Sequence, residues 1–437
     1  MKIGIIGLGF VGLSFASVLA SKGFDIVGID VDIKKLETIK SGKSPFYEPK
    51  IEETLQKGLE KKLMLSEKIE YAVNNCDLIF VTVGTPMTSD GNIDLRIILN
   101  ACKKIGEALL KTQNKPDIII KSTVIPGTTI NKIKKKIELK SLKKEGEGFT
   151  LITNPEFLRE GRAIEDTKNP HLIIIGTSRK KSAEKLKNFY EKMYGKKIPI
   201  IITNNTTAEI IKYANNSFLA TKISFINNIA NLCQILPGTN VDIVAKAIGI
   251  DPRIGQQFLN AGPGYGGSCL PKDVQAMMIF QKNLGEESVL LNAVHQTNIL
   301  QIDKIINLIE KSVGNLKNKQ ITILGLSFKE ESDDIRESTS IKLIEILLKK
   351  QAKIRVHDPK AIENTKTIFG DKISYHNKIK DALNNSHCTV IMTPWKQYSN
   401  LKNSDFDVML KKIIIDTRRI LNLNDNNLTY VGLGMGS

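Results

Sequence analysis

Cys269 follows a glycine-rich stretch, GPGYGGS at residues 262–268, and precedes Asp273 by four residues. Glycine lets the backbone approach a ligand closely and adopt angles that other residues avoid. A thiol behind such a loop is therefore either a nucleophile or a small apolar residue buried after a turn. The segment that follows, LPKDVQAMMIFQKNLG, predicts a helix with Pro271 in its first turn.

The reactivity of Cys269 depends on what lies near it. The dipole of the predicted helix favours a thiolate by roughly 0.3–1 kcal/mol. This is less than one pKa unit, which corresponds to about 1.4 kcal/mol. A thiolate that dominates at neutral pH therefore needs a neighbouring cation, and Lys212 is the candidate if the fold brings it close.

Lys212 and Asn216 lie one turn apart in TTAEIIKYANNSFLATKISFINNIANLCQIL, residues 206–236. This stretch has no glycine or proline and is apolar on most sides, so it predicts a long, largely buried helix. An unpartnered ammonium is costly in such a place. Lys212 either extends its ammonium outward to water or lines a polar pocket with a lowered pKa.

Two carboxylates, Glu156 and Glu160, stand four residues apart in NPEFLREGRAIED, residues 154–166, after an apolar strand. If a helical turn begins here, they share one face. Carboxylates at the end of a strand can perform general acid–base catalysis. They can equally pair with Arg159 and Arg162 at the surface, and the residues alone slightly favour that interpretation.

The first strand–turn–helix of the chain contains GLGFVG, with Gly7, Gly9 and Gly12 in the GxGxxG pattern. A second strand ends at Asp30. This context predicts a dinucleotide site, with the pyrophosphate at the helix N-terminus. Asp30 would accept hydrogen bonds from ribose hydroxyls and repel a 2′-phosphate, which favours NAD over NADP. The similar GLGMG at residues 432–436 precedes no predicted helix and is interpreted as a loop.

Hydroxyl groups follow two later strands. Thr85 lies in VGTP and Thr123 in STVIPGTT. Ligands gather at the carboxyl ends of strands in doubly wound sheets, so these hydroxyls either face a ligand or cap a helix.

Strands alternating with helices predict an α/β protein with parallel sheets covered on both faces. The stretch from residue 319 to Asp358 repeats the strand–turn–helix–strand theme with only Gly325 in its turn. It is either a second nucleotide-binding unit or a generic βαβ unit. The 437 residues require more than one core. We expect two Rossmann-like doubly wound domains, residues 1–204 and 314–437, joined by a long central helix and helical region, residues 205–313.

Composition limits the compartment and the partners. Five cysteines without a CxxC pair predict reduced thiols, no disulfide and no zinc site, and no histidine pair has ligand spacing, so no metal is expected. The net charge of +17 favours anionic partners. Its densest run, NKIKKKIELKSLKKEGEG, lacks the aromatic residues that stack bases and predicts a solvated helix face rather than a nucleic-acid site. No apolar run reaches membrane length, and the N-terminus does not resemble a signal peptide, so we expect a cytoplasmic protein.

Seven motifs occur in a fixed order: GLGFVG, VGTP, STVIPGTT, NPEFLREG, KYANNSFLA, GPGYGGSCLPKD and GLSFKEESDDIRES. In this order they resemble the UDP-glucose 6-dehydrogenase branch of the UDP-glucose/GDP-mannose dehydrogenase family, over essentially the whole chain. The resemblance implies an NAD domain, a central helical dimerisation region and a UDP-binding domain. It also implies oxidation of UDP-glucose to UDP-glucuronate by two NAD and water, through thiohemiacetal and thioester intermediates on a cysteine.

The resemblance also implies roles for matching residues. The nucleophile would be Cys269, with Lys212, Asn216 and Asp273 stabilising oxyanions, Glu156 as acid–base and Thr123 holding a water. The cofactor contacts would be Gly7, Gly9, Phe10, Val11, Gly12, Asp30, Lys35, Thr85, Thr123, Glu160 and Arg336. The substrate contacts would be Glu156, Phe157, Leu158, Arg159, Glu160, Lys212, Asn216, Asn260, Gly264, Tyr265, Gly266, Phe328, Lys329 and Arg418. Arg253 would reach the sugar nucleotide from a partner subunit, which implies a homodimer or a higher homo-oligomer.

The sugar is the open part of this assignment. GDP-mannose dehydrogenases share the chemistry, whereas UDP-N-acetylmannosamine dehydrogenases usually have histidine where Ser268 stands. A catalytically silent sensor of NAD and a sugar nucleotide is the alternative from another class. Nucleic-acid binding driven by charge is a third, and it predicts salt-sensitive affinity.

Overall fold

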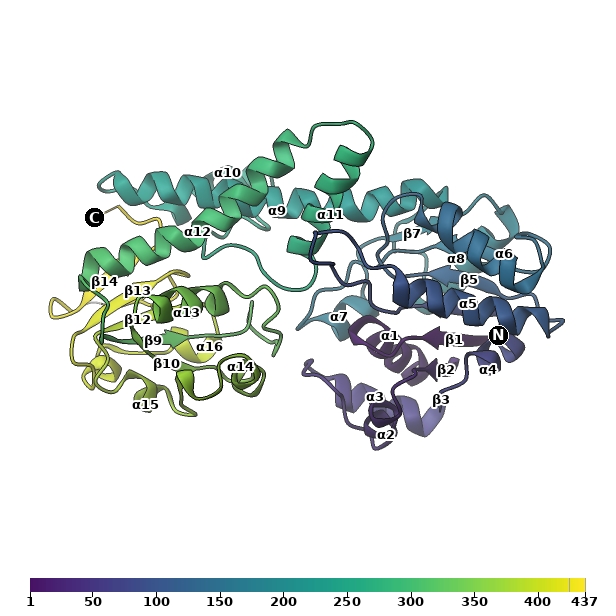
Figure 1. The fold of residues 1–437 in the computed structure, drawn as a ribbon, viewed down its shortest axis with the longest axis horizontal. Helices are drawn as coiled ribbons and strands as arrows, with labels where there is room; N and C mark the ends of the chain where they lie inside the picture. Colours follow the sequence, from purple (N-terminus) through teal and green to yellow (C-terminus); the bar gives the residue numbers. More distant parts are fainter. Residues whose placement is uncertain (424, 437) are drawn as a thin grey trace. The chain divides into compact units, whose positions relative to one another are not determined.

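The computed structural model describes residues 1–423 and 425–436. Their contacts divide the chain into two compact units, Met1–Asn215 and a second unit that begins at Asn216. Each unit contains one sheet with helices packed on its faces (Figure 1). The chain is therefore an α/β protein with two Rossmann-like sheets and a helical region between them in the sequence, as the alternation of strands and helices predicts.

The first sheet has eight strands in the order β3-β2-β1-β4-β5-β6-β7-β8. They are β1 Lys2–Ile6, β2 Asp25–Ile29, β3 Leu63–Ser66, β4 Leu78–Val81, β5 Asp117–Ile120, β6 Thr150–Thr153, β7 Ile173–Gly176 and β8 Ile200–Thr203. The helices of this unit are α1 Phe10–Ser21, α2 Ile33–Lys40, α3 Ile51–Lys61, α4 Ile69–Asn75, α5 Arg96–Leu110, α6 Lys135–Ser141, α7 Ala163–Lys168 and α8 Lys180–Tyr194, with a π-helical turn at Thr129–Lys134 before α6.

Helices cover both faces of this sheet because alternate side chains of a strand point to opposite sides. In β4, Leu78 and Phe80 belong to the core beneath α1, α3 and α8. Ile79 and Val81 belong to the core beneath α4, α5 and α6. Strands buried on both faces read as continuous apolar runs, which is why the sequence locates them well.

The direction of the last two strands differs from the prediction of a parallel sheet. β7 and β8 run parallel to each other, but β6 and β7 pair antiparallel at Thr153 and Gly176. A parallel connection needs a crossover, usually a helix, that carries the chain back along the sheet. Residues 154–172 contain only the six-residue α7, so the chain returns in the opposite direction.

The second sheet has six parallel strands in the order β11-β10-β9-β12-β13-β14. They are β9 Gln320–Leu324, β10 Lys353–His357, β11 Ser374–Tyr375, β12 Cys388–Ile391, β13 Ile413–Asp416 and β14 Thr429–Gly432. Its helices are α13 Thr339–Lys349, α14 Ile362–Phe369, α15 Ile379–Leu383 and α16 Lys396–Ser399, with 3-10 turns at Gly370–Lys372 and Asn403–Phe406. Gly432 closes β14, and no helix follows it among the described residues, so GLGMG is mostly a loop as predicted.

The central helices are α9 Asn205–Ile235, α10 Val241–Ile250, α11 Leu270–Asn283 and α12 Val289–Val313. Within the second unit, α9 packs along α12, where Ser224 donates a hydrogen bond to the carbonyl of Val294 (2.9 Å). The prediction that α9 is buried nearly all round is wrong. Phe218, Phe225 and Leu232, spaced seven residues apart, are 65%, 51% and 50% exposed. The apolar composition of α9 predicted that these side chains would be buried, but in the single chain they are exposed.

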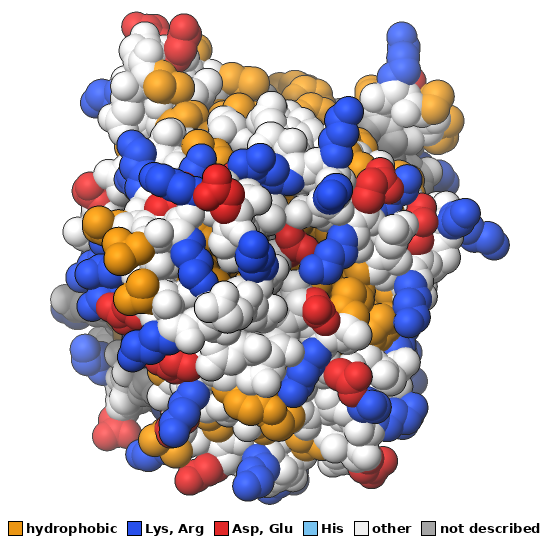
Figure 2. Space-filling view, turned by 90° about the vertical axis from the view of Figure 1, so that its right-hand side faces the viewer, with side chains coloured by type: hydrophobic (Ala, Val, Ile, Leu, Met, Phe, Trp, Pro, Cys, Tyr) orange, Lys and Arg blue, Asp and Glu red, His pale blue; other side chains and the backbone are white. Residues whose placement is uncertain are grey.

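On one face of the molecule, charged residues of both signs are interspersed rather than gathered by sign (Figure 2). On the face drawn in Figure 2, lysines and arginines alternate with acidic side chains and apolar groups. In the basic run, Lys132 and Lys135 are exposed while Ile133 and Ile137 are buried, so this run forms the solvated helix face that was predicted. None of the described helices combines the length and the apolarity that crossing a bilayer requires.

Candidate active site

The glycine turn between β1 and α1 forms a cradle at the carboxyl edge of the first sheet. A Cβ at Gly7, where φ is 98°, would lie 2.9 Å from the backbone of Val83. A Cβ at Gly12 would lie 1.9 Å from the carbonyl oxygen of Gly7. At Gly9, in contrast, nothing lies within 4 Å. Gly7 and Gly12 are thus required by packing, and the open space at Gly9 lies at the N-terminus of α1, where a pyrophosphate fits.

Asp30, at the end of β2, lies beside this turn as predicted. It is 7% exposed and accepts hydrogen bonds from the amides of Leu8 (2.8 Å) and Asp32 (3.0 Å). Lys35 forms an ion pair with it at 3.0 Å. The structure therefore brings together the glycines, Asp30 and Lys35. Phe10 and Val11 form the first turn of α1 beside them.

Thr85 and Thr123 are joined directly. The Thr85 hydroxyl donates to the carbonyl of Thr123 (2.7 Å) and thus links the loops after β4 and β5. Of the two interpretations of Thr85 from the sequence, helix capping does not hold.

Glu156 and Lys212 form a buried ion pair. The Lys212 ammonium, on the second turn of α9, lies 2.9 Å from Oε1 of Glu156, and their side chains are 5% and 9% exposed. Oε2 of Glu156 accepts the amide of Leu158 at 2.6 Å. The Lys212 ammonium also lies 5.4 Å from the centre of the Phe157 ring. Lys212 therefore lines a polar site and does not extend to water.

The surface interpretation is wrong for Glu156. Residues 154–160 are irregular, and the next helix, α7, begins only at Ala163, so the two carboxylates share no helical face. Arg159 pairs instead with Asp166 at 2.7 Å. The partner of Glu156 lies 56 residues away, and no local pattern indicates such a pair.

Charge keeps Glu156 ionised despite its burial. Burial alone would raise its pKa. The Lys212 ammonium, its hydrogen bond, the Leu158 amide and the charge of Lys121 together lower that pKa below its ordinary value. Glu156 is therefore a carboxylate at neutral pH, as a general base must be.

Lys121 is a second buried ammonium that the sequence did not single out. It ends the apolar strand β5, is 7% exposed and donates to Oδ1 of Asn154 at 3.1 Å. Burial lowers the pKa of Lys121 to about 8, although the charge of Glu156 acts in the opposite direction. Tyr190 also donates to Asn154. These residues line a cavity of about 40 Å³ behind Glu156, large enough for a water molecule. The sequence offered one sign of this site: the apolar run at residues 118–120 is followed directly by the charged Lys121.

In the second unit, Asn216 and Asp273 lie together. The Asn216 amide donates to Asp273 at 2.6 Å, and Asp273, which is 1% exposed, also pairs with Lys272. Asn216 follows Lys212 by one turn on the continuous helix α9. Asp273 lies in the first turn of α11, whose N-cap is Cys269.

Cys269 differs from the other cysteines. It is exposed, with its sulfur 3.6 Å from the Ser268 hydroxyl, at the start of α11 with Pro271 in the first turn as predicted. The other four cysteines are buried, and all five lie within the described residues. Burial raises the pKa of Cys76 to about 11 and that of Cys102 to about 12. Those thiols are therefore poor nucleophiles at neutral pH.

The glycine loop before Cys269 packs on the second sheet's first turn. A Cβ at Gly266 would lie 2.4 Å from the carbonyl of Glu337, and one at Gly267 would lie 2.6 Å from the Phe328 ring. The Gly267 amide donates to the carbonyl of Arg336 at 3.0 Å. The structure thus joins Gly266 with Phe328. The amide of Tyr265, next to Gly264, is held by Asn298 at 2.7 Å.

The remaining predicted contacts lie as follows. Arg418 donates to the carbonyl of Met392 at 2.8 Å and lies against Gly262. Burial lowers the pKa of Arg418 to about 10, which leaves it charged at neutral pH. Lys329 lies 5.7 Å from the Phe328 ring. The other three predicted contacts are exposed to solvent. The Arg253 side chain is 86% exposed and pairs with Asp251. The Arg336 side chain is 64% exposed and pairs with Asp334, and Asn260 is also exposed.

Three family models match the chain in order. They describe the NAD binding domain (residues 1–194), the central domain (206–299) and the UDP binding domain (322–423) of the UDP-glucose/GDP-mannose dehydrogenase family. The chain is 39% identical over 428 residues to a UDP-glucose 6-dehydrogenase of Rickettsia conorii, covering 96% of each. It is 37% identical over 423 residues to one of Haloferax volcanii, covering 96% of this chain and 97% of the relative.

Two solved structures are also similar over nearly the whole chain. A UDP-glucose dehydrogenase from Pyrobaculum islandicum has a TM-score of 0.91 at 33% identity, covering 99% of this chain and 98% of the other. A UDP-D-ManNAc dehydrogenase from Pyrococcus horikoshii has a TM-score of 0.87 at 27% identity, covering 99% of each.

Proposed function

Because the chain belongs to the UDP-glucose/GDP-mannose dehydrogenase family, and is thus an NAD-dependent nucleotide-sugar dehydrogenase, we propose that its substrate is UDP-glucose. The product is UDP-glucuronate, formed with two NAD and one water. Residues 1–204 bind NAD, residues 205–313 form the dimer, and residues 314–437 bind UDP. Identity of 37–39% to UDP-glucose 6-dehydrogenases supports this choice of sugar.

The first oxidation removes a hydride from C6 of the sugar and a proton from its hydroxyl. The glycine turn and Asp30 would hold NAD, which would supply the hydride acceptor. The proton passes through a water held at Thr123 to Glu156, whose lowered pKa keeps it ionised and able to accept. Lys212 stabilises the negative charge that develops on the oxygen.

The second oxidation uses the sulfur of Cys269. The thiolate adds to the aldehyde carbon, and the aldehyde oxygen takes a proton to form a thiohemiacetal. A second NAD would supply the acceptor for the hydride from C6, and loss of the hydroxyl proton to solvent leaves a thioester. Lys212 and Asn216, one turn apart on α9, stabilise the oxygen in both states.

Hydrolysis completes the reaction. Glu156 accepts one proton from the attacking water as a carbon–oxygen bond forms, and the carbon–sulfur bond breaks to release the thiolate of Cys269. The carboxylic acid then loses a second proton to solvent and leaves as the carboxylate. Overall, the alcohol, two NAD and water give the carboxylate, two NADH and three protons.

The observation that supports this proposal most directly is the exposure of Cys269. A thiol reached by solvent at the N-terminus of a 14-residue helix, behind a glycine loop, is poised for addition to a carbonyl. We also propose a cytoplasmic location, since five cysteines without a CxxC pair are typical of a reducing compartment.

The test is the yield of NADH per sugar. Purified protein with limiting UDP-glucose and excess NAD should form two NADH per sugar, and Cys269→Ser should lower turnover at least 1,000-fold. Cys76→Ala, a buried thiol in the first unit, is the matched control and should retain activity. One NADH per sugar with release of aldehyde would rule out the thioester step.

The sugar is tested with a panel of UDP-glucose, UDP-galactose, GDP-mannose and UDP-N-acetylhexosamines. UDP-glucose should have the highest kcat/KM. A higher value for GDP-mannose or a UDP-N-acetylhexosamine would reassign the substrate and keep the mechanism.

The protein also acts as a homodimer in this proposal, with Arg253 reaching the partner's substrate. The exposed stripe of Phe218, Phe225 and Leu232 on α9 supports it, because an isolated chain would leave these side chains in water. Light scattering should give twice the mass of one chain, and Phe218→Glu/Phe225→Glu should give a monomer. A wild-type monomer would contradict the dimer.

A further inference from the structure

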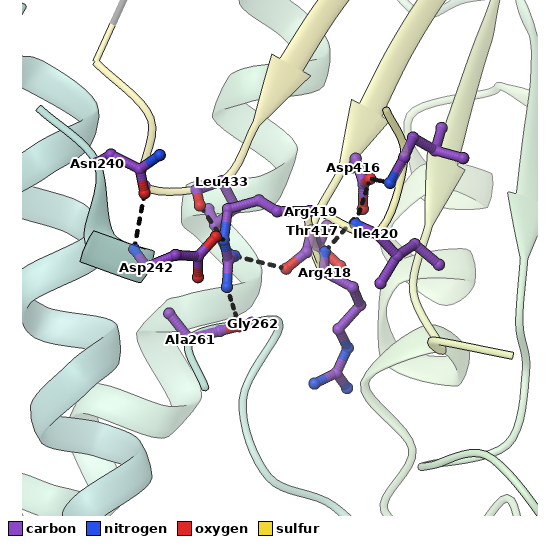
Figure 3. Close-up of polar contacts among 12 residues, drawn as sticks. Asn240, Asp242, Ala261, Gly262, Asp416, Thr417, Arg418, Arg419, Ile420 and Leu433 are labelled. Carbon is purple, nitrogen blue, oxygen red and sulfur yellow. Dashed lines mark hydrogen bonds and ion pairs between the residues drawn. The ribbon is translucent and has the colours of Figure 1, made fainter. Parts of the chain in front are cut away.

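Arg419 lies in the loop between β13 and β14, and its guanidinium joins three segments of the second unit (Figure 3). Nε pairs with Asp242, at the start of α10, at 2.8 Å. The two terminal nitrogens donate to the carbonyls of Ala261 (2.9 Å) and Leu433 (3.0 Å). The side chain is 4% exposed. Each contact is charge-assisted, and the geometry uses the planar fork of arginine.

Two of these segments lead into other parts of the second unit, namely the glycine loop and the C-terminal loop. Ala261 precedes Gly262, where the loop to Cys269 begins. Leu433 precedes the C-terminal loop, which is anchored to the turn between α9 and α10. There, the Val241 amide donates to the carbonyl of Gly434 (3.0 Å), and the Gly434 amide donates to Gln234 (2.7 Å). Arg419 thus lies where the glycine loop, α10 and the C-terminal loop meet.

The backbone around Arg419 is held in an uncommon conformation. Its φ is 53°, in the left-handed region that non-glycine residues rarely adopt. Asp416 holds this turn by accepting the amides of Arg418 (3.0 Å), Ile420 (2.8 Å) and Leu421 (2.9 Å). As a result, the side chains of Arg418 and Arg419 point away from each other (Figure 3).

The opposite side chain, Arg418, is the predicted nucleotide contact. It lies against Gly262, because a Cβ at that glycine would be 2.8 Å from its Nη1. The Gly262 carbonyl accepts Gln301 (3.0 Å), and its amide donates to Asn227 (2.8 Å). Three side chains thus hold the backbone of residues 261–262, and of these Arg419 is the one that shares its turn with Arg418.

We propose that Arg419 is a positioning residue for the sugar nucleotide: by holding the carbonyl of Ala261 from the turn that it shares with Arg418, it fixes Arg418 relative to the glycine loop. This rests on the proposed function, in which both elements contact the UDP-sugar. Lysine cannot replace arginine here, because a single ammonium cannot donate to Asp242, Ala261 and Leu433 in the same directions.

The test measures UDP binding by calorimetry and steady-state kinetics for Arg419→Gln, Arg419→Lys and Asp242→Asn. Arg419→Gln should raise the Kd of UDP and the KM of UDP-glucose at least 10-fold, leave kcat within about threefold and leave the KM of NAD unchanged. Arg419→Lys should give nearly the same loss. Asp242→Asn, which keeps an acceptor oxygen but removes the negative charge of a half-exposed partner, should raise the Kd of UDP two- to threefold.

The matched control is Arg355→Gln. Arg355, in β10, also donates to backbone carbonyls, of Ala382 (3.0 Å) and Asp381 (2.5 Å), but contacts no part of the glycine loop. It should lower Tm and leave the Kd of UDP within twofold. The same outcome for both Arg419 variants would overturn the positioning role. Failure of wild-type protein to bind UDP would instead overturn the proposed function together with this inference.

Discussion

Replacing Lys212 with methionine should destabilise the first unit and reverse the pH dependence of its stability. The substitution removes the ammonium 2.9 Å from Glu156 and leaves a carboxylate that is 9% exposed. Removing one partner of a buried ion pair costs about 3–5 kcal/mol, whereas replacing both partners by neutral groups is often nearly neutral. Lys212→Met should therefore lose about 3 kcal/mol or more, and Lys212→Met/Glu156→Gln should recover most of it.

The sign of the pH effect follows from the pKa of Glu156. In wild type this pKa is lowered, so its contribution to stability is present above the ordinary value near 4.5 and is lost as the pH falls through the lowered value. Without Lys212, burial is opposed only by the Leu158 amide and the charge of Lys121, and because burial is the largest single influence we expect the pKa to rise above its ordinary value. The folded state then holds a proton that the unfolded state has lost, so stability falls as the pH rises through that interval.

The assay is urea unfolding at pH 4.5–8 of wild type, Lys212→Met, Glu156→Gln and the double variant. Unfolding is monitored by hydrogen exchange in the strands of the first sheet, so that the second unit does not contribute to the signal. Lys57→Met, which breaks an exposed ion pair with Glu53 at 2.6 Å, is the control and should show no measurable loss of stability. Additive losses for Lys212→Met and Glu156→Gln, or an unchanged pH profile, would refute this account of the pair.

Three other changes have defined outcomes. The pKa of Lys121 falls from 10.5 to about 8 on folding. The unfolded state therefore binds more protons between these two values, and stability should rise by about 3 kcal/mol across pH 8–10.5. Lys121→Met should abolish this rise in thermal melts, and a rise that persists in the variant would contradict the prediction. Gly12→Ala should abolish NAD binding measured by calorimetry, because its Cβ would lie 1.9 Å from the carbonyl oxygen of Gly7; Kd within threefold of wild type would contradict this. Gly434→Ala should lower Tm by several degrees, since φ is 79° and the Cβ would lie 2.6 Å from Val241; an unchanged Tm would show that the C-terminal loop is not anchored as described.

The features that the sequence predicts are those with a local cause. The turn at Gly7 and Gly12 needs glycine for its own geometry, so the pattern is visible in six residues. Buried strands are continuous apolar runs, and α11 begins at Leu270, directly before a proline that suits a first turn.

The features that the sequence misses depend on distant partners. The pairing of Glu156 with Lys212 and the burial of Lys121 arise from segments that meet only in the folded unit. The reversal at β7 is equally hidden, because a strand looks the same in either direction. The exposure of Phe218 on α9 was missed for another reason. An apolar helix face indicates that burial of that face would be favourable, but the pattern does not show whether the same chain buries it.

Cys269 is exposed and the other four cysteines are buried, so the protein offers thiol-selective electrophiles a single target. One equivalent of iodoacetamide should add one carbamidomethyl group, about 57 Da, at Cys269 alone, and if Cys269 is the nucleophile as proposed, the same reaction should inactivate the protein and count its competent molecules. For the same reason, mild oxidants such as peroxide would stop turnover without unfolding the chain, and a thiol reductant would restore it while the sulfur remains at the sulfenic stage.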